Sequence, residues 1–416
     1  MNILLIGNGF DLAHGLPTRY TDFLEFCIRV QRIYSYIEGG SVENYVENYI
    51  LDLKTNNEIL DVLRQAVKNR KLSDKGEDKY TTNNIYLDEL YDCIGNNVWL
   101  EYFSSCDSYI GENWIDFETE ISQVIQALDA AAKLIKKEKD INDLSGSKKE
   151  IIKNIVEKIN PDDGKRLQVK EVLGCLDKLS KVITLLERDL NMLIRALEIY
   201  LCEFVEKIEI RKISPNIDKL EIDFILSFNY THTFSRLYQV SERYKKEFND
   251  PFDYIHGEVK INNTVEKNNM VLGIDEYLGK KRRNKDIDFI AFKKYYQRIY
   301  KGTGSKYKDW LDIIKKNRDE IEDKLDKKYP KQIPFKCFQG KQHYLYIFGH
   351  SLDVTDKDIL SDLILNDNVY TTIFYRNREQ RGQQIANLVK VIGQDELIRR
   401  TGGSTKTIKF ELQKDM

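Results

Sequence analysis

The sequence has little of what marks several common protein classes. Its six cysteines are scattered through 416 residues, and none forms a Cys-x-x-Cys pair, which argues against a zinc ribbon and against a redox motif. Scattered thiols in a large chain are typical of the reducing cytosol, so we expect a cytoplasmic protein. The formal net charge is only −2, so the composition gives no support for binding to nucleic acid.

Long apolar runs are missing as well. No stretch approaches the roughly 20 residues that span a bilayer, and we therefore expect no membrane-embedded segment. The first apolar run, Ile3 to Ile6, is short and follows no basic leader, so we do not expect a signal peptide. Hydrophobic residues make up 41% of the chain and charged residues 32%, which suffices for a core and a well solvated surface.

Several catalytic and binding motifs are also absent. Leu12 stands where the dinucleotide fingerprint Gly-x-Gly-x-x-Gly has its third glycine, and no acidic strand end follows about 20 residues later. No Gly-Lys-Ser/Thr occurs, which excludes a P-loop kinase or ATPase at the level of motifs. The five histidines lack His-x-x-x-His spacing, and no Gly-x-Ser-x-Gly elbow favours a serine hydrolase. We therefore expect no metal ion.

The first residues nevertheless show a pattern typical of nucleotide-binding α/β domains. The run Ile3 to Ile6 predicts a short buried strand, which breaks at Gly7 and Gly9. Glycines in such a turn let the backbone approach another molecule closely, although a plain strand-to-helix turn needs them too. Asp11 and His14 follow, and both can hold ribose hydroxyls or move a proton. Asp11 can equally cap a short helix.

Three later apolar runs predict strands that end in polar residues. These runs precede Asn229, His256 and the segment Gly349–Ser351, and a further strand end is expected at Met270–Ile274. Strands that alternate with helices predict a largely parallel sheet, whose carboxyl ends meet at one edge, where ligands bind. We therefore expect Asn229, His256 and Gly349–Ser351 to meet the glycine turn there. Asp356 follows and can cap the next helix.

The chain between the first predicted strand, Ile3 to Ile6, and the strand that precedes Asn229 is helical in pattern. Residues 40–215 show apolar stripes at helical spacing, among them a leucine-rich stripe from 173 to 197, and their charged runs indicate solvated helix faces. We expect a Rossmann-like α/β domain built from residues 1–39 and 216–416. An all-helical insertion over 40–215 interrupts it, and a lysine-rich helical segment is expected near 280–330.

An amide and an imidazole at neighbouring strand ends suit bond cleavage at a sugar carbon. The oxocarbenium-like transition state needs an oriented water or ribose hydroxyl, which Asn229 can hold, and a base of near-neutral pKa, which His256 supplies. If the bond that breaks joins ribose to a positively charged nicotinamide ring, nicotinamide leaves as a neutral molecule, and no strong general acid is required. Each residue alone has an alternative role, because Asn229 can satisfy a turn and His256 can pack in the core.

Three segments carry a resemblance to a known family. They are Ile6–Thr18, with the residues Ile-Gly-Asn-Gly-Phe-Asp-Leu-Ala-His-Gly-Leu-Pro-Thr, Ser227–Thr231, and Gly349–Asp356. These segments resemble the bacteriophage abortive infection AbiH family. Their order also resembles, more distantly, the SIR2-like NAD-binding fold, which implies a SIR2-like Rossmann domain with NAD as the substrate.

The resemblance implies a role for individual residues. Asn229 and His256 map to the SIR2-like catalytic pair. The residues that map to the NAD-holding turns are Gly7, Asn8, Gly9, Phe10, Asp11, Gly349 and Ser351, and those we add as pocket candidates are His14, His350 and Asp356. Two departures stand out, since the chain lacks the four-cysteine zinc ribbon of SIR2 deacetylases and has Thr231 where SIR2-like sequences commonly have Asp. Lysine deacetylation is therefore disfavoured.

The leading hypothesis is an antiphage protein that hydrolyses NAD⁺ to nicotinamide and ADP-ribose. Asn229 would orient the water and the ribose, and His256 would act as base toward a ribose hydroxyl. One alternative is a non-catalytic module that senses NAD or ADP-ribose, and a less favoured one is a Mg²⁺-dependent nuclease, for which the acidic residues show no two-metal spacing. A phage-derived trigger and a homo-oligomer are both left open.

Overall fold

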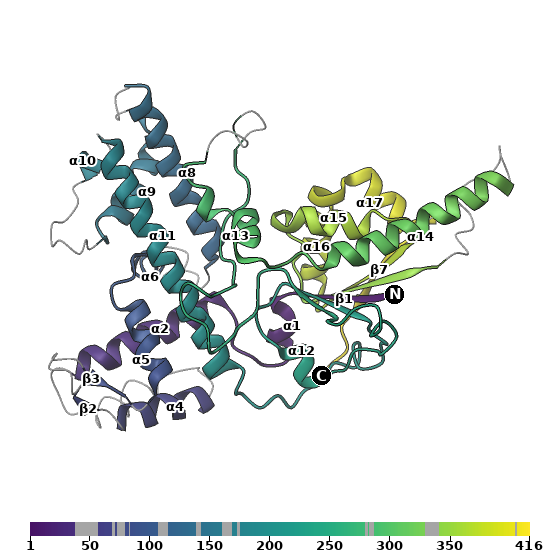
Figure 1. The fold of residues 1–416 in the computed structure, drawn as a ribbon, viewed down its shortest axis with the longest axis horizontal. Helices are drawn as coiled ribbons and strands as arrows, with labels where there is room; N and C mark the ends of the chain where they lie inside the picture. The colour runs from purple at the N-terminus through teal and green to yellow at the C-terminus, as the bar shows by residue number, and fades with distance from the viewer. Residues whose placement is uncertain are drawn as a thin grey trace. The chain divides into compact units, whose positions relative to one another are not determined.

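The structure is a computed structural model in which the described residues form two compact units. The described residues are 1–37, 57–68, 71–72, 80–82, 84–106, 115–138, 143–159, 169–172, 175–278, 282, 287–328, 341–403 and 406–416. The sheet unit consists of Met1–Leu16, Glu209–Glu258 and Gly302–Met416, and the helical unit of Pro17–Ile208 and Val259–Lys301 (Figure 1). The domain boundary expected between residues 39 and 40 lies outside the described residues.

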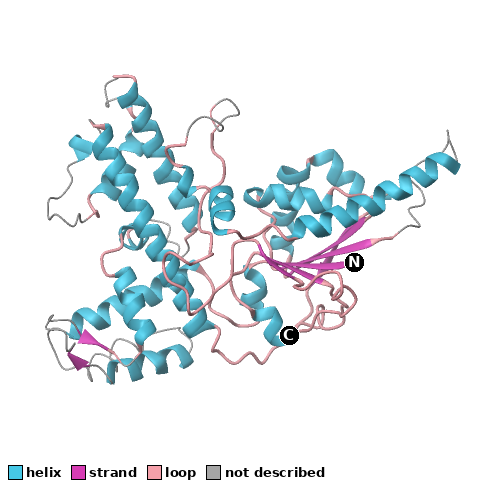
Figure 2. Cartoon of the chain, in the orientation of Figure 1, coloured by secondary structure: helices cyan, strands magenta, loops and turns pink. Residues whose placement is uncertain are grey.

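The sheet unit is built on six parallel strands (Figure 2). They are β1 (Asn2–Ile6), β4 (Phe224–Ser227), β5 (Phe252–Tyr254), β6 (His343–Phe348), β7 (Val369–Tyr375) and β8 (Ile408–Leu412), in the spatial order β5-β4-β1-β6-β7-β8. The predicted α/β class with a Rossmann-like parallel sheet is therefore confirmed. The central strand β1 is apolar on both faces, as expected for a parallel strand that is covered on both sides.

Helices pack on both faces of this sheet. Ile3 and Leu5 of β1 lie in a core shared with α14 (Tyr307–Lys328), α15 (Lys357–Ile364), α16 (Arg378–Ile392) and α17 (Gln394–Thr401). Leu4 and Ile6 face the opposite core, which includes Phe10 of α1 (Asn8–Ala13) and Phe234 of α12 (Thr233–Leu237). The alternation of side chains along β1 thus divides the sheet unit into three layers.

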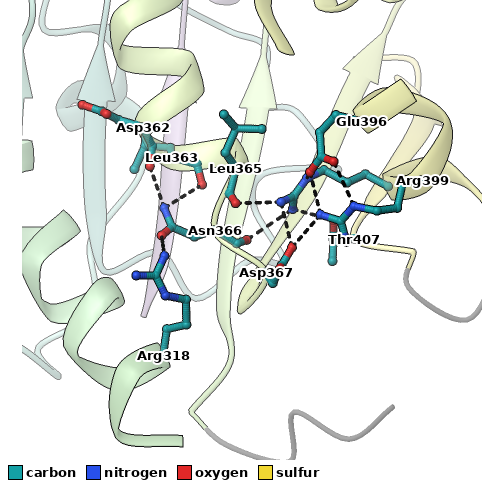
Figure 3. Close-up of polar contacts among 10 residues, drawn as sticks. Arg318, Asp362, Leu363, Leu365, Asn366, Asp367, Glu396, Arg399 and Thr407 are labelled. Carbon is teal, nitrogen blue, oxygen red and sulfur yellow. Dashed lines mark hydrogen bonds and ion pairs between the residues drawn. The ribbon is translucent and has the colours of Figure 1, made fainter. Parts of the chain in front are cut away.

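A buried arginine holds the edge of the sheet where β7 begins. Arg400 is 1% exposed and donates to the carbonyl oxygen of Leu365 at 2.6 Å and to Asp367 at 2.8 Å. Figure 3 shows how Glu396 and Arg399 join this network. The hydrogen bond from Arg399 lowers the pKa of Glu396 to about 2. This edge is the amino end of the strands, and its polar groups pair with one another.

The helical unit contains most of the remaining elements. They are α2 (Tyr20–Ile37), α4 (Asn57–Lys68), α5 (Ile85–Ile94), α6 (Val98–Ser104), α8 (Phe117–Lys136), α9 (Gly146–Val156), α10 (Val169–Val172), α11 (Leu176–Ile199), the π-helical turn η3 (Tyr200–Val205), the short helix η4 (Ile290–Phe292), α13 (Lys294–Lys301) and the strand pair β2 (Lys71–Leu72) and β3 (Tyr80–Thr81). Most of the predicted leucine-rich stripe from 173 to 197 lies on the buried face of α11. Leu176 is exposed, Leu185 is half-buried, and residue 173 lies outside the described residues.

A fully buried carboxylate fixes residues 259–301 to this unit. Glu198 of α11 is 0% exposed and pairs with Arg195 at 2.7 Å. It also accepts the backbone N–H of Lys260 at 2.9 Å and the side-chain amides of Asn263 and Asn268. Since a buried charge without partners is costly, these contacts hold the later segment against α11.

The strand expected to end near Ile274 does not form. Ile274 makes only an isolated bridge with Lys293. The reason is a contact with α13. The side-chain amide of Gln297 on that helix accepts the N–H of Leu272 at 3.0 Å and donates to the carbonyl oxygen of Leu272 at 3.1 Å. A side chain thus takes up the backbone groups that a neighbouring strand would have used.

Within the described part of the chain, no helix has the length and apolar character needed to cross a membrane.

Candidate functional site

The carboxyl ends of four neighbouring strands bring the predicted residues together. β5, β4, β1 and β6 are parallel neighbours, so the chain leaves all four at the same edge of the sheet. Asn229 and His256 each lie two residues beyond the Ser227–Tyr254 pair. His350 lies two residues beyond Phe348, which pairs with Ile6. The predicted convergence of polar strand ends is confirmed.

The carboxylate of Asp356 lies between two imidazole rings. Its Oδ1 is 3.7 Å from Nε2 of His256, and its Oδ2 is 3.4 Å from Nε2 of His350. The exposed fractions of His256, His350 and Asp356 are 7%, 4% and 9%. The ring of Phe228 makes T-shaped contacts with both histidines, at centroid distances of 5.5 and 4.4 Å. Histidines from two strand ends therefore share one buried carboxylate beside the ring of Phe228.

The backbone around Leu352 determines which nitrogen of His350 carries the proton. The N–H of Leu352 donates to Nδ1 of His350 at 2.9 Å, so we assign the proton of the neutral ring to Nε2, which faces Asp356. Leu352 is fully buried and has φ = +59°, a conformation that non-glycine residues rarely adopt. Such strain clusters at functional sites, where the surrounding packing maintains it.

The same assignment bears on metal binding. A nitrogen that carries a proton offers no lone pair to a metal ion, so in this tautomer Nε2 of His350, which lies 3.4 Å from Asp356, is not a metal ligand. Within the described ranges, no group of three histidine, cysteine or acidic side chains is arranged to hold a metal ion.

The side-chain amide of Asn229 is not used by the turn in which it lies. Ser227 satisfies this turn, because its Oγ accepts the N–H of Asn229 at 3.1 Å and donates to the carbonyl oxygen of Asn229 at 2.9 Å. Asn229 is 5% exposed, and its Nδ2 has no hydrogen-bond partner among the residues that the structure describes. A buried donor without a partner costs about 1–3 kcal/mol and calls for an explanation. An oxygen atom of a bound ligand could accept a hydrogen bond from this donor.

The glycine turn packs against the chain itself. The N–H groups of Gly7, Gly9 and Phe10 donate to the carbonyl oxygens of Phe348, Gly349 and Gly7, respectively. A Cβ on Gly7 would lie 2.8 Å from Cα of His350, and a Cβ on Gly9 would lie 2.8 Å from Cα of Gly349. The close approach that these glycines permit is therefore taken by the turn after β6. Asn8 is exposed at the start of α1.

Asp11 and His14 are both tied to neighbouring elements. Asp11 is 1% exposed and accepts a hydrogen bond from Oγ1 of Thr231 at 2.6 Å, which links the glycine turn to the segment after β4. Nδ1 of His14 donates to the carbonyl oxygen of Phe10 at 2.7 Å, so its Nε2 accepts from the hydroxyl of Tyr238 at 2.9 Å. Burial lowers the pKa of His14. Both of its ring nitrogens therefore serve the fold.

Two amide side chains hold the loop that carries Ser351, which is itself exposed. Gln384 donates to the carbonyl oxygen of His350 at 3.2 Å, and Asn387 donates to that of Ser351 at 2.9 Å. Sequence reasoning missed both of these residues and also Phe228. Gln384 and Asn387 lie on the amphipathic helix α16, where a buried amide gives no signal that distinguishes it from a surface residue.

Comparison with known protein families finds a match over most of the chain. The family model described as bacteriophage abortive infection AbiH matches residues 3–376, a range that includes Asn229, His256, His350 and Asp356. No curated protein and no solved structure matches the chain.

Proposed function

The chain belongs to the bacteriophage abortive infection AbiH family, which supports a role in abortive infection, and we propose that it fulfils this role as an NAD⁺ glycohydrolase. The observation that carries the proposal is the buried amide of Asn229, whose donor is left unused beside His256 and His350. An amide donor and a histidine beside a carboxylate can serve bond cleavage at a ribose carbon.

The proposed reaction breaks one bond and forms one. The bond between C1′ of the ribose and N1 of nicotinamide breaks, and its electron pair neutralises the positive charge of the pyridinium ring. A water oxygen bonds to C1′, which gives ADP-ribose, and one proton is released. Asn229 orients the water and the ribose hydroxyls. His256 takes a proton from a ribose hydroxyl as positive charge develops at C1′, and passes it to solvent. The ribose oxygen then takes up the proton that the attacking water loses, so one proton is released in all.

The residues at this edge fit the nicotinamide-ribose end of the substrate better than its pyrophosphate. Asn229 offers a donor, and His256 lies at the neighbouring strand end. The glycine turn supports the proposal less, because the N–H groups of Gly7, Gly9 and Phe10 already donate within the chain. NAD binding by Gly7–Asp11, Gly349 and Ser351 therefore remains a proposal that rests on the resemblance.

The experiment measures nicotinamide release from NAD⁺ by the purified full-length protein, with and without a phage lysate. Substitution of a general base costs about 10²–10⁴-fold in rate, so we expect losses of that size in Asn229→Ala and His256→Ala. The matched control is His232→Ala, because His232 pairs with Glu258 at 3.1 Å and lies outside the Asp356 cluster.

The outcomes separate the two main functions. Unchanged nicotinamide release in both Asn229→Ala and His256→Ala contradicts the catalytic assignment. Binding of NAD or ADP-ribose in calorimetry, with no nicotinamide release under either condition, identifies the non-catalytic sensing module instead. Cellular NAD⁺ that falls on phage infection in cells with the wild-type protein, but not with His256→Ala, supports the hydrolase in its proposed setting.

A further inference from the structure

We propose that Asp356 is a positioning residue for His256, and that His350 is a fixed partner which holds the carboxylate in place. The catalytic part of this inference rests on the proposed NAD⁺ hydrolysis, whereas the coupling between the three side chains does not. The two histidines thus have different roles, although each lies about equally close to Asp356.

The asymmetry follows from the hydrogen bond at Leu352. Protonation of His350 would place a second proton on its Nδ1, directly against the N–H that Leu352 points at it. The strained backbone of Leu352 and its buried side chain leave this N–H little freedom to turn away. A proton that enters the cluster is therefore taken by His256. His350 keeps its Nδ1 as the acceptor of the Leu352 N–H and its Nε2 directed at Asp356.

The surroundings strengthen the effect of Asp356 on His256. Among the described residues, Asp356 lies against His256 from the segment after β6, and His350 lies against the same carboxylate. Phe228 packs against both rings from the end of β4. Because His256 and Asp356 are both buried, the carboxylate attracts an imidazolium more strongly than it would in water. The 3.7 Å separation is too long for a hydrogen bond, and catalytic contacts of this kind often shorten when the substrate binds.

The direction of the contact also identifies the reacting nitrogen. Nε2 of His256 faces Asp356, so Nδ1 is the nitrogen that takes the proton from the substrate. Asp356 then stabilises the imidazolium that forms, which is the part that an aspartate plays beside the histidine of a catalytic triad. His350, through its Nε2–H, keeps the second carboxylate oxygen from turning away.

The first test uses NMR of the full-length protein labelled with ¹⁵N-histidine and titrated from pH 5 to 9 without substrate. His256→Gln and His350→Gln assign the signals. We expect the His350 ring to keep the Nε2–H tautomer throughout, and the His256 pKa to fall by about one unit or more in Asp356→Asn. The matched control is Asp353→Asn on the same loop, because Asp353 caps the N–H of Thr355 at 3.1 Å rather than a histidine. An unchanged His256 pKa in Asp356→Asn overturns the inference.

The second test compares kcat and KM for NAD⁺ hydrolysis. We expect kcat to fall by about 10²-fold or more in Asp356→Asn with little change in KM. Asp353→Asn, which leaves His256, His350 and Asp356 in place, should retain most of kcat. A kcat that is normal in Asp356→Asn, or that falls equally in Asp353→Asn, contradicts the assigned role of Asp356. If wild type releases no nicotinamide, the hydrolase proposal fails, and the NMR titration alone decides the coupling.

Discussion

Gly9 donates its backbone N–H to the carbonyl oxygen of Gly349 at 2.8 Å, and a Cβ atom on Gly349 would lie 2.4 Å from the carbonyl carbon of Gly9. The turn after β1 and the turn after β6 are thus packed backbone against backbone. Gly349 also has φ = +70°, a region that favours glycine. Both glycines are therefore required by the fold, whatever else the turn binds.

Gly349→Ala should destabilise the protein. The added methyl group would meet the backbone nitrogen of Phe10 at 2.2 Å, and a left-handed alanine is strained, so we expect a loss of about 1–3 kcal/mol in the free energy of unfolding. Urea denaturation followed by circular dichroism measures it. Gly382→Ala is the matched control, because Gly382 lies within α16 with open space around its Cβ position.

In that control, alanine should stabilise the helix by about 0.5–1 kcal/mol. Equal effects of the two substitutions would show that the close contact at Gly349 relaxes at little cost. The packing argument for the glycine turn would then fail.

Tyr238→Phe tests the structural role found for His14. The Tyr238 hydroxyl accepts the N–H of Ser214 at 2.7 Å and donates to Nε2 of His14, so its removal leaves two buried groups without a partner. We expect a loss of about 1–3 kcal/mol in the free energy of unfolding, again by urea denaturation. NAD⁺ binding measured by calorimetry should be unchanged. Weaker binding at unchanged stability would instead support His14 as a pocket residue.

The sequence predicts the sheet well because its strands are buried on both faces. The continuous apolar runs at Ile3–Ile6 and Phe224–Leu226 are compatible with a buried helix or a strand, and their short length favours a strand. Once these strands are assumed to be parallel, the meeting of Asn229 and His256 at one edge follows from their positions after the strands.

The roles of single residues at that edge are harder to predict. A glycine in the sequence does not indicate whether a ligand or the protein itself occupies the space beside it. At Gly7 and Gly9 that space is occupied by the backbone of Gly349 and His350. His256 and Asp356 are 100 positions apart, and no local pattern pairs them. The sequence left two roles open for the Asn229 side chain, to satisfy a turn or to contact a ligand. The structure shows that Ser227 makes the hydrogen bonds of the turn.

Arg195→Met should destabilise the helical unit strongly. Arg195 is 1% exposed and pairs with Glu198 and Glu89, so its loss leaves the charge of the fully buried Glu198 without its cation. Breaking a buried ion pair from one side costs about 3–5 kcal/mol. The comparison is Lys207→Met, which removes the more exposed partner of Glu203 and should cost less than about 1 kcal/mol. Chemical denaturation measures the free energy of unfolding of both variants. A small and equal loss of stability in the two would mean that the surroundings of Glu198 relax or take up water.

His343 should make the stability of the sheet unit depend on pH. Burial, with smaller contributions from the N-terminal ammonium and Lys341, lowers the pKa of His343 to about 4. The unfolded chain, with an ordinary histidine pKa near 6.5, then binds the proton more readily than the folded protein does. Stability is therefore complete above about pH 6.5 and is lost progressively as the pH falls toward 4.

Replacement of His343 isolates this contribution. His343→Gln removes the titrating ring, so the urea midpoint of the variant should fall less steeply than that of wild type between pH 6.5 and 4.5. At pH 7.5 the two proteins should differ by a constant amount, which reflects the lost contact between Nε2 of His343 and Asn317 at 3.1 Å. Tyr344→Phe, the next residue on β6, removes no group that titrates in this range and should keep the wild-type slope. Some slope remains in every variant because burial also lowers the pKa of His14. A His343→Gln slope equal to that of wild type would show that the proton enters elsewhere.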